Sequence, residues 1–175
     1  MIKGKRVVFI IAHSNFRDEE LFETKKVIEE NGGIATIAST DLTPARGMFG
    51  ALAKPELTLD KVIVDNYDAL IFVGGSGSEI YFNNPRAHLI AREASEKNKV
   101  LAAICIAPCI LANAGVVSGK SATVWDGKYI EILRRKGVRY SAEPVVTDCK
   151  IVTAKGPEFA REFGEAIVRL LSLES

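Results

Sequence analysis

The sequence is poor in histidine and cysteine, two residue types that commonly bind metal ions in proteins. It contains two histidines and three cysteines, and His13 and His88 lie in unrelated segments. No CxxC pair and no ligand spacing typical of a zinc site is present. We therefore expect no metal site, and we expect the three cysteines to be reduced thiols.

The sequence also lacks a strong net charge and a long apolar run. A formal net charge of +1 gives no electrostatic reason to expect nucleic acid or an anionic membrane surface as a partner. No segment approaches the length of a membrane span. Residues 7–12 are too short for the core of a signal peptide, and His13 and charged residues follow them. We expect a cytoplasmic protein without a membrane partner.

The composition of the 175 residues is that of a globular protein, with 47% hydrophobic and 26% charged residues. This length predicts a single domain over residues 1–175. Several short runs are apolar throughout and rich in β-branched residues, which is typical of strands buried on both faces of a parallel sheet. They span residues 7–12, 34–39, 69–73 and 100–104. Residues 144–154 predict two further strands around a turn at Asp148.

Helical patterns separate the predicted strands. A helix from Glu19 to Glu30 is expected to end at the following glycines, and Asn84 followed by Pro85 is a typical helix start. Two more helices are expected, one from an N-cap at Asp126 to Gly137 and one after residues 155–159. Residues 45–62 predict a glycine-punctuated hairpin. The alternation of strand and helix predicts a doubly wound α/β domain.

That architecture also predicts where a ligand binds. In open parallel sheets, ligands bind outside the carboxyl ends of the strands, near the topological switch point. The segments that follow the predicted strands carry polar, glycine or cysteine residues: 13–20, 74–79, 105–108 and 155–159. We expect these four segments to meet at one edge of the sheet.

Cys105 is the first candidate for chemistry at that edge. It follows a predicted strand and precedes a helix that contains Pro108, which is the order of a nucleophile elbow. The sulfur would then lie near a helix N-terminus, whose partial positive charge favours the thiolate. Cysteine is also among the most buried residue types, so an ordinary core position remains open at this point.

Two neighbouring segments offer groups that would assist a nucleophile. Gly74 and Gly75 open a glycine-rich loop whose N–H groups suit an oxyanion, although such a loop is also an ordinary strand-to-helix turn. Asp18 and Glu19 are ordinary acidic residues of a first helical turn. Glu20 lies beside the buried face and is the best candidate to face the crevice. Next to a thiolate, it would have to be protonated.

Four other residues carry weaker signals. His13 follows the first strand, where it would serve as an acid or base or as a hydrogen-bonded structural residue. Trp125 fits a packing or interface anchor better than a substrate contact. Cys109 fits a small core residue, and an i,i+4 disulfide with Cys105 would be strained. Cys149 is expected at an exposed hairpin turn.

Taken together, these segments resemble the ThiJ/PfpI superfamily, also called the DJ-one superfamily. The quoted matches are "AAICIAPCILANAGVVSGKSATVW", "FRDEEL", "FVGGSGS" and "VTAKGPEFAREFGEAIVRLL". They occur in order and span almost the whole chain. The resemblance implies a flavodoxin-like three-layer α/β/α sandwich with a central, mostly parallel sheet, as in class I glutamine amidotransferases.

The resemblance also implies roles for individual residues. The reactive cysteine of the family falls on Cys105, and the glutamate that hydrogen-bonds its sulfur as a protonated carboxyl falls on Glu20. The backbone donors for an oxyanion fall on Gly74 or Gly75 and on Ile106. Such proteins are typically homodimers or larger homo-oligomers that need no cofactor.

Three positions depart from the family pattern. Ile106 stands where the peptidase branch has a histidine directly after the cysteine, and Trp125 stands where the DJ-one branch has its histidine. Arg17 replaces the first glutamate of the "FEDxEL" motif. No histidine matches either branch, and only His13, outside the motif, would substitute as a base.

Three hypotheses for function follow. The first is a cysteine-dependent enzyme of the glyoxalase or deglycase kind, in which Cys105 attacks a small reactive carbonyl compound and Glu20 moves protons. The second is a redox- or stress-responsive protein that is oxidised at Cys105. The third is a non-catalytic member of the superfamily. A peptidase ranks behind all three, because Ile106 replaces histidine.

Overall fold

The structure is a computed structural model that describes residues 1–174. Its centre is a seven-stranded sheet in the order β11-β12-β8-β7-β1-β3-β6. Every neighbouring pair in it is parallel except β11 and β12. The sheet strands are β1 (Arg6–Ile10), β3 (Ile34–Ser39), β6 (Leu57–Thr58), β7 (Ala69–Phe72), β8 (Val100–Ile104), β11 (Val145–Asp148) and β12 (Ile151–Ala154).

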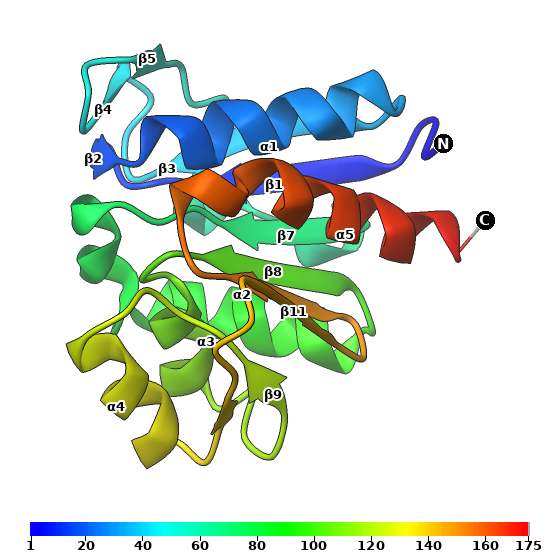
Figure 1. Cartoon of the computed structure of the whole chain (residues 1–175). Helices are drawn as coiled ribbons and strands as arrows, with labels where there is room; N and C mark the ends of the chain where they lie inside the picture. The colour runs from blue at the N-terminus through cyan, green and yellow to red at the C-terminus, as the bar shows by residue number, and fades with distance from the viewer. Residues whose placement is uncertain (175) are drawn as a thin grey trace.

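Helices cover both faces of this sheet (Figure 1). They are α1 (Asp18–Glu30), α2 (Pro85–Glu96), α3 (Pro108–Ala114), α4 (Lys128–Arg135) and α5 (Ala160–Ser172). Helices α1 and α5 pack together on one face, whereas α2 and α3 pack on the other. The flavodoxin-like three-layer sandwich with a mostly parallel sheet is therefore confirmed.

The pattern of burial explains why the strands were recognisable. On β1, Val7 and Phe9 belong to the core between the sheet and helices α1 and α5. Val8 and Ile10 belong to the core on the opposite face, between the sheet and helices α2 and α3. Successive side chains of a strand point to opposite faces. A strand covered on both sides must therefore be apolar at every position.

Further short elements lie between the main strands and helices along the chain. Short strands β2 (Ser14–Phe16), β4 (Ala45–Gly47) and β5 (Leu52–Ala53) form a second sheet, and β4 and β5 make the expected hairpin. Strands β9 (Ser121–Ala122) and β10 (Arg139–Tyr140) form a third. The 3-10 helices are Leu59–Lys61, Val64–Asn66, Ser76–Tyr81 and Pro157–Phe159. Sequence patterns did not predict β2, β9 or β10.

Most of the expected helix ends occur, with one correction. The Asn84 side chain accepts a hydrogen bond from the Ala87 N–H at 2.9 Å and caps α2. The expected cap by Asp126 is wrong, because Gly127 precedes α4 and no side chain caps it. The Asp126 carboxylate instead accepts a hydrogen bond from the Lys155 ammonium at 2.7 Å. This ion pair holds the pKa of Asp126 below its usual value.

No helix within residues 1–174 is long and apolar enough to cross a membrane.

Candidate active site

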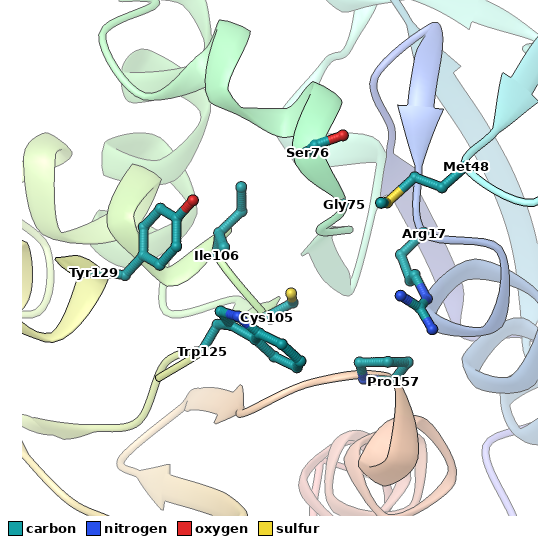
Figure 2. Close-up of a pocket in the computed structure, with 9 residues that line it drawn as sticks. All are labelled: Arg17, Met48, Gly75, Ser76, Cys105, Ile106, Trp125, Tyr129 and Pro157. Atoms are coloured by element: carbon teal, nitrogen blue, oxygen red, sulfur yellow. The ribbon is translucent and has the colours of Figure 1, made fainter. Parts of the chain in front are cut away.

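The order of the strands in the central sheet predicts where the site lies. From β1 the chain passes to β3 on one side, and it later returns to β7 on the other side of β1. The topological switch point therefore lies between β1 and β7, where a crevice forms at the carboxyl ends. A cavity of about 190 Å³ opens there. Its lining residues are Arg17, Met48, Gly75, Ser76, Cys105, Ile106, Trp125, Tyr129 and Pro157 (Figure 2).

This lining confirms the expected meeting of four chain segments. One residue or more comes from each of the segments 13–20, 74–79, 105–108 and 155–159. Sequence reasoning missed Met48, from the β4–β5 hairpin, and Tyr129, from the first turn of α4. Neither had a recognisable motif, because only the folded chain brings them to the cavity.

Cys105 lies at the sharp turn that follows β8. Its φ angle is 65°, a conformation that costs a non-glycine residue on the order of 1–3 kcal/mol. Neighbouring segments hold the turn on both sides. The Cys105 N–H donates to the Ala154 carbonyl at 2.9 Å, and its carbonyl accepts from the Trp125 N–H at 2.8 Å. The residue is 8% exposed, and its sulfur lies at the middle of the lining in Figure 2.

Two backbone N–H groups and one carboxyl group surround the sulfur. The N–H groups of Gly75 and Ile106 lie at the sulfur, and both act to lower the pKa of the Cys105 thiol. Burial and, next, the negative charge of an ionised Glu20 raise that pKa above its usual value. The effects that raise the pKa of Cys105 outweigh those that lower it, so the resting group is the neutral thiol. Of the two predicted glycines, Gly75 and not Gly74 lies at the sulfur, whereas Gly74 adjoins the carboxyl of Glu20.

Glu20 is fully buried in the first turn of α1. Neither carboxyl oxygen makes a hydrogen bond of normal geometry within residues 1–174. Burial raises the pKa of Glu20 to about 8, although the Cys105 thiol and the Arg17 charge oppose the rise. A buried carboxyl without a strong partner takes up a proton. At neutral pH, Glu20 is therefore protonated, adds no negative charge beside the sulfur, and has an O–H to donate.

Asp18 fixes the loop that carries Met48 over the cavity. Its carboxylate accepts hydrogen bonds from the N–H groups of Phe49 and Ala51, each at 2.9 Å. Gly47 packs so closely on this carboxylate that a Cβ atom there would lie 2.5 Å from Oδ1. Asp18 is therefore more than an acidic residue of a first helical turn, because it links α1 to the β4–β5 hairpin.

The two histidines do not line the cavity. Nε2 of His13 lies 2.9 Å from the Thr43 carbonyl oxygen and 3.0 Å from its hydroxyl oxygen. Nε2 of His88 lies 2.7 Å from the Phe82 carbonyl oxygen. The structure thus gives Cys105 no imidazole neighbour within residues 1–174, and both rings have partners elsewhere.

The remaining candidate residues are distributed between the cavity and the rest of the fold. Trp125 lines the cavity and is 41% exposed, and its ring packs on Gly156. Cys109 is fully buried in α3, as expected of a core residue, and Cys149 is exposed at the turn between β11 and β12. No group of three or more metal-ligating side chains is assembled within residues 1–174.

The fold and this elbow define a class of α/β proteins that present a cysteine between a parallel strand and a helix. Residues 5–170 match the DJ-1/PfpI family, and the chain belongs to that family.

Individual relatives match along nearly the whole chain. An uncharacterized protein of Methanocaldococcus jannaschii is 40% identical over 172 residues, which cover 97% of this chain and 84% of that protein. A protein named deglycase from Pyrococcus horikoshii is 32% identical over 166 residues, with coverage of 95% and 99%. A crystal structure of a ThiJ/PfpI domain protein from Brachyspira murdochii superposes with a TM-score of 0.95 at 29% identity, with 99% of both chains covered.

Proposed function

We propose that the protein is a cysteine-dependent enzyme that acts on small reactive carbonyl compounds such as methylglyoxal. One observation carries the proposal: Cys105 lies in a small cavity between two backbone N–H groups and a buried, protonated carboxyl. The cavity of about 190 Å³ is smaller than the roughly 300–1,000 Å³ of sites for drug-sized ligands, which favours a substrate of few atoms. Relatives named deglycases support the same class of chemistry.

In the first step, the Cys105 thiol adds across the aldehyde carbonyl group. The sulfur–carbon bond forms as the carbonyl π bond breaks, and the oxygen lies against the N–H groups of Gly75 and Ile106. Glu20 donates its proton to that oxygen and receives the thiol proton. The product is a hemithioacetal, and Glu20 remains protonated. A neutral carboxylic acid carries out this exchange because it has both an O–H and a free oxygen.

The later steps need only water as a co-reactant. A proton moves from the former aldehyde carbon to the neighbouring ketone carbon through an enediol, with Glu20 relaying it. The first carbon is oxidised to a thioester and the second is reduced to an alcohol, so the electrons balance within the substrate. Water then cleaves the thioester to lactate and restores the thiol.

Replacing Cys105 with serine is expected to lower methylglyoxal consumption at least about 100-fold, because serine is a much weaker nucleophile than cysteine. Loss of methylglyoxal and formation of lactate are measured for the wild-type protein and for Cys105→Ser. Cys149→Ser is the matched control, since Cys149 is exposed outside the cavity. Equal turnover by Cys105→Ser and the wild-type protein would disprove the proposal.

The same geometry favours one second candidate, a sensor that is oxidised at Cys105. The N–H groups of Gly75 and Ile106 and the O–H of Glu20 are donors suited to the oxygens of a sulfenate or sulfinate. After mild peroxide treatment, mass spectrometry is expected to find oxidation concentrated at Cys105. Oxidation confined to the exposed Cys149 would reject the sensor.

Peptide hydrolysis is disfavoured, because no histidine lines the cavity to protonate a leaving amine.

A further inference from the structure

Among residues 1–174, Arg17 is the only charged residue in the lining of the Cys105 cavity. It directly precedes α1, and in Figure 2 it lies across the cavity from Ile106 and Tyr129. The other side chains that line the cavity are apolar or uncharged. A cavity with one fixed positive charge favours a ligand that carries one negative charge.

The guanidinium group of Arg17 is held in place from two sides. Its Nε donates a hydrogen bond to the Glu19 carboxylate at 2.6 Å. Its carbon lies 4.6 Å from the centre of the Phe49 ring, a cation–π contact. Phe49 is itself placed by the hydrogen bond of its N–H to Asp18. An arginine that is already oriented loses less entropy when it binds a ligand.

The far edge of the guanidinium group is free for such a ligand. Within residues 1–174, the bond to Glu19 is the only hydrogen bond that the Arg17 side chain makes, so both terminal Nη groups have donors to offer. Two parallel N–H donors match the two oxygens of a carboxylate. The side chain is 26% exposed, which leaves it accessible yet less screened than a fully solvated charge.

We propose that Arg17 is a specificity-determining residue that binds a carboxylate, and that Cys105 prefers, among small carbonyl compounds, those that carry a carboxylate, of which glyoxylate is the simplest. This inference rests on the proposed function, because Cys105 is taken as the group that meets the electrophile. The carboxylate lies at the Arg17 side of the cavity, and the carbonyl carbon lies at the sulfur. The apolar side formed by Ile106 and Trp125 accommodates the rest of a short chain.

The test compares two alkylating reagents that differ in charge but react alike. Iodoacetate carries a carboxylate, whereas iodoacetamide is its neutral amide, and each forms a thioether with Cys105 and releases iodide. Both reagents react with the thiolate, so the ratio of their rates does not depend on the fraction of Cys105 that is present as thiolate. Rates at Cys105 are measured by mass spectrometry, with N-acetylcysteine as the reference thiol. The ratio is expected to favour iodoacetate at Cys105 relative to N-acetylcysteine, and Arg17→Gln is expected to lower it about 10-fold.

Three variants separate carboxylate binding from a general effect of charge. Arg46→Gln removes an exposed cation of β4 that does not line the cavity, and it is expected to leave the ratio unchanged. The double variant Arg17→Gln/Glu19→Gln removes both members of the ion pair, so the net charge stays constant. The ratio is expected to stay low in the double variant. A return to the wild-type ratio there would overturn the proposal. Arg17→Lys is expected to give a ratio between that of Arg17→Gln and that of the wild-type protein.

A second measurement uses the wild-type protein and so does not depend on the folding of a variant. Glyoxylate is expected to protect Cys105 from iodoacetamide at lower concentration than glyoxal, which has the same two-carbon skeleton but no charge. Equal protection would overturn the proposal, as would a failure of both reagents to alkylate Cys105. Methylglyoxal turnover without any charge preference would leave the proposed function intact and reject only the role of Arg17. A charge preference that depends on Arg17, without turnover of methylglyoxal, would support the role of Arg17 and reject the proposed function.

Discussion

Replacing Glu20 with glutamine is expected to flatten the dependence of stability on pH between pH 5 and pH 8. The pKa of Glu20 is about 8 in the folded protein, whereas that of an unfolded glutamate is about 4.3. Between these values the folded state holds a proton that the unfolded state has lost. The free energy of unfolding of the wild-type protein therefore falls by about 1.4 kcal/mol for each unit of rising pH.

The sign follows from the raised pKa of an acid. The stability gained from the protonated Glu20 is fully present below the unfolded pKa and is lost as the pH rises toward 8. Over pH 5 to 8 the loss amounts to roughly 4 kcal/mol. Glutamine has no proton to lose, so Glu20→Gln lacks this slope. The aspartates with lowered pKa, among them Asp41, Asp60 and Asp126, titrate below this window and affect both proteins alike.

The measurement is urea unfolding at several pH values between 5 and 8. The difference in free energy of unfolding between the wild-type protein and Glu20→Gln is expected to change by roughly 4 kcal/mol in favour of the variant as the pH rises. Glu23→Gln is the matched control, because Glu23 is an exposed residue of the same helix. Parallel curves for the wild-type protein and Glu20→Gln would mean that Glu20 is ionised throughout the window.

This prediction bears directly on the chemistry of Cys105. The negative charge of an ionised Glu20 is the second largest cause of the raised pKa of the thiol. While Glu20 is protonated, that cause is absent, and the N–H groups of Gly75 and Ile106 act on the sulfur with less opposition. Two groups this close share their protons, so the pair titrates as a unit. Activity that requires the protonated carboxyl is therefore expected to decline as the pH passes about 8.

The sequence was sufficient to predict the frame of the site. The central strands are buried on both faces and are apolar throughout, so their patterns were unambiguous, and residues 34–39 and 100–104 coincide with β3 and β8. Parallel strands end at the same edge of a sheet, which placed Cys105 near the glycine loop. Glu20 was expected beside the buried face because it precedes the apolar residue Leu21, and it is fully buried, whereas the burial of Asp18 in the same helical turn was not expected.

The contacts that complete the site depend on long-range packing and had no local signal. Asp126 has the residue type and position of an N-cap, but Lys155, 29 residues later, binds its carboxylate. Met48 and Tyr129 reach the cavity only because distant segments fold over the switch point. Strands β9 and β10 are two residues long, which is too short for any alternation to be seen.

The structure explains why glycines are needed in the loop of residues 74–79. The sequence predicts donors for an oxyanion or an ordinary turn at these glycines, and the structure shows that the backbone of residues 14–17 is their main constraint. A Cβ on Gly75 would overlap with the backbone of Asn15 and Arg17, and φ at Gly75 is 99°. A Cβ on Gly77 would overlap with the Ser14 carbonyl oxygen. The close approach of these two segments brings the Gly75 N–H to the sulfur.

Gly77→Ala is therefore expected to lower the free energy of unfolding by about 3 kcal/mol or more. The φ angle of Gly77 does not lie in the left-handed region, so the cost arises from overlap alone. The overlapping atom belongs to the backbone of β2, which cannot rotate away as a side chain can, and overpacking against fixed atoms is among the more costly substitutions. Relief requires the 74–79 loop to move from β2, which also displaces the Gly75 N–H from Cys105.

Gly115→Ala provides the matched control for this experiment. Gly115 follows α3 with φ of 84°, and within residues 1–174 no heavy atom other than those of its chain neighbours lies within 4 Å of an added Cβ. Its substitution costs only the left-handed conformation, on the order of 1–2 kcal/mol. Urea unfolding of both variants compares the two costs directly, and alkylation of Cys105 by iodoacetamide reports on the loop. If Gly77→Ala proved no more destabilising than Gly115→Ala, the 74–79 loop would not be pinned by β2. The arrangement of donors around Cys105 would then need another cause.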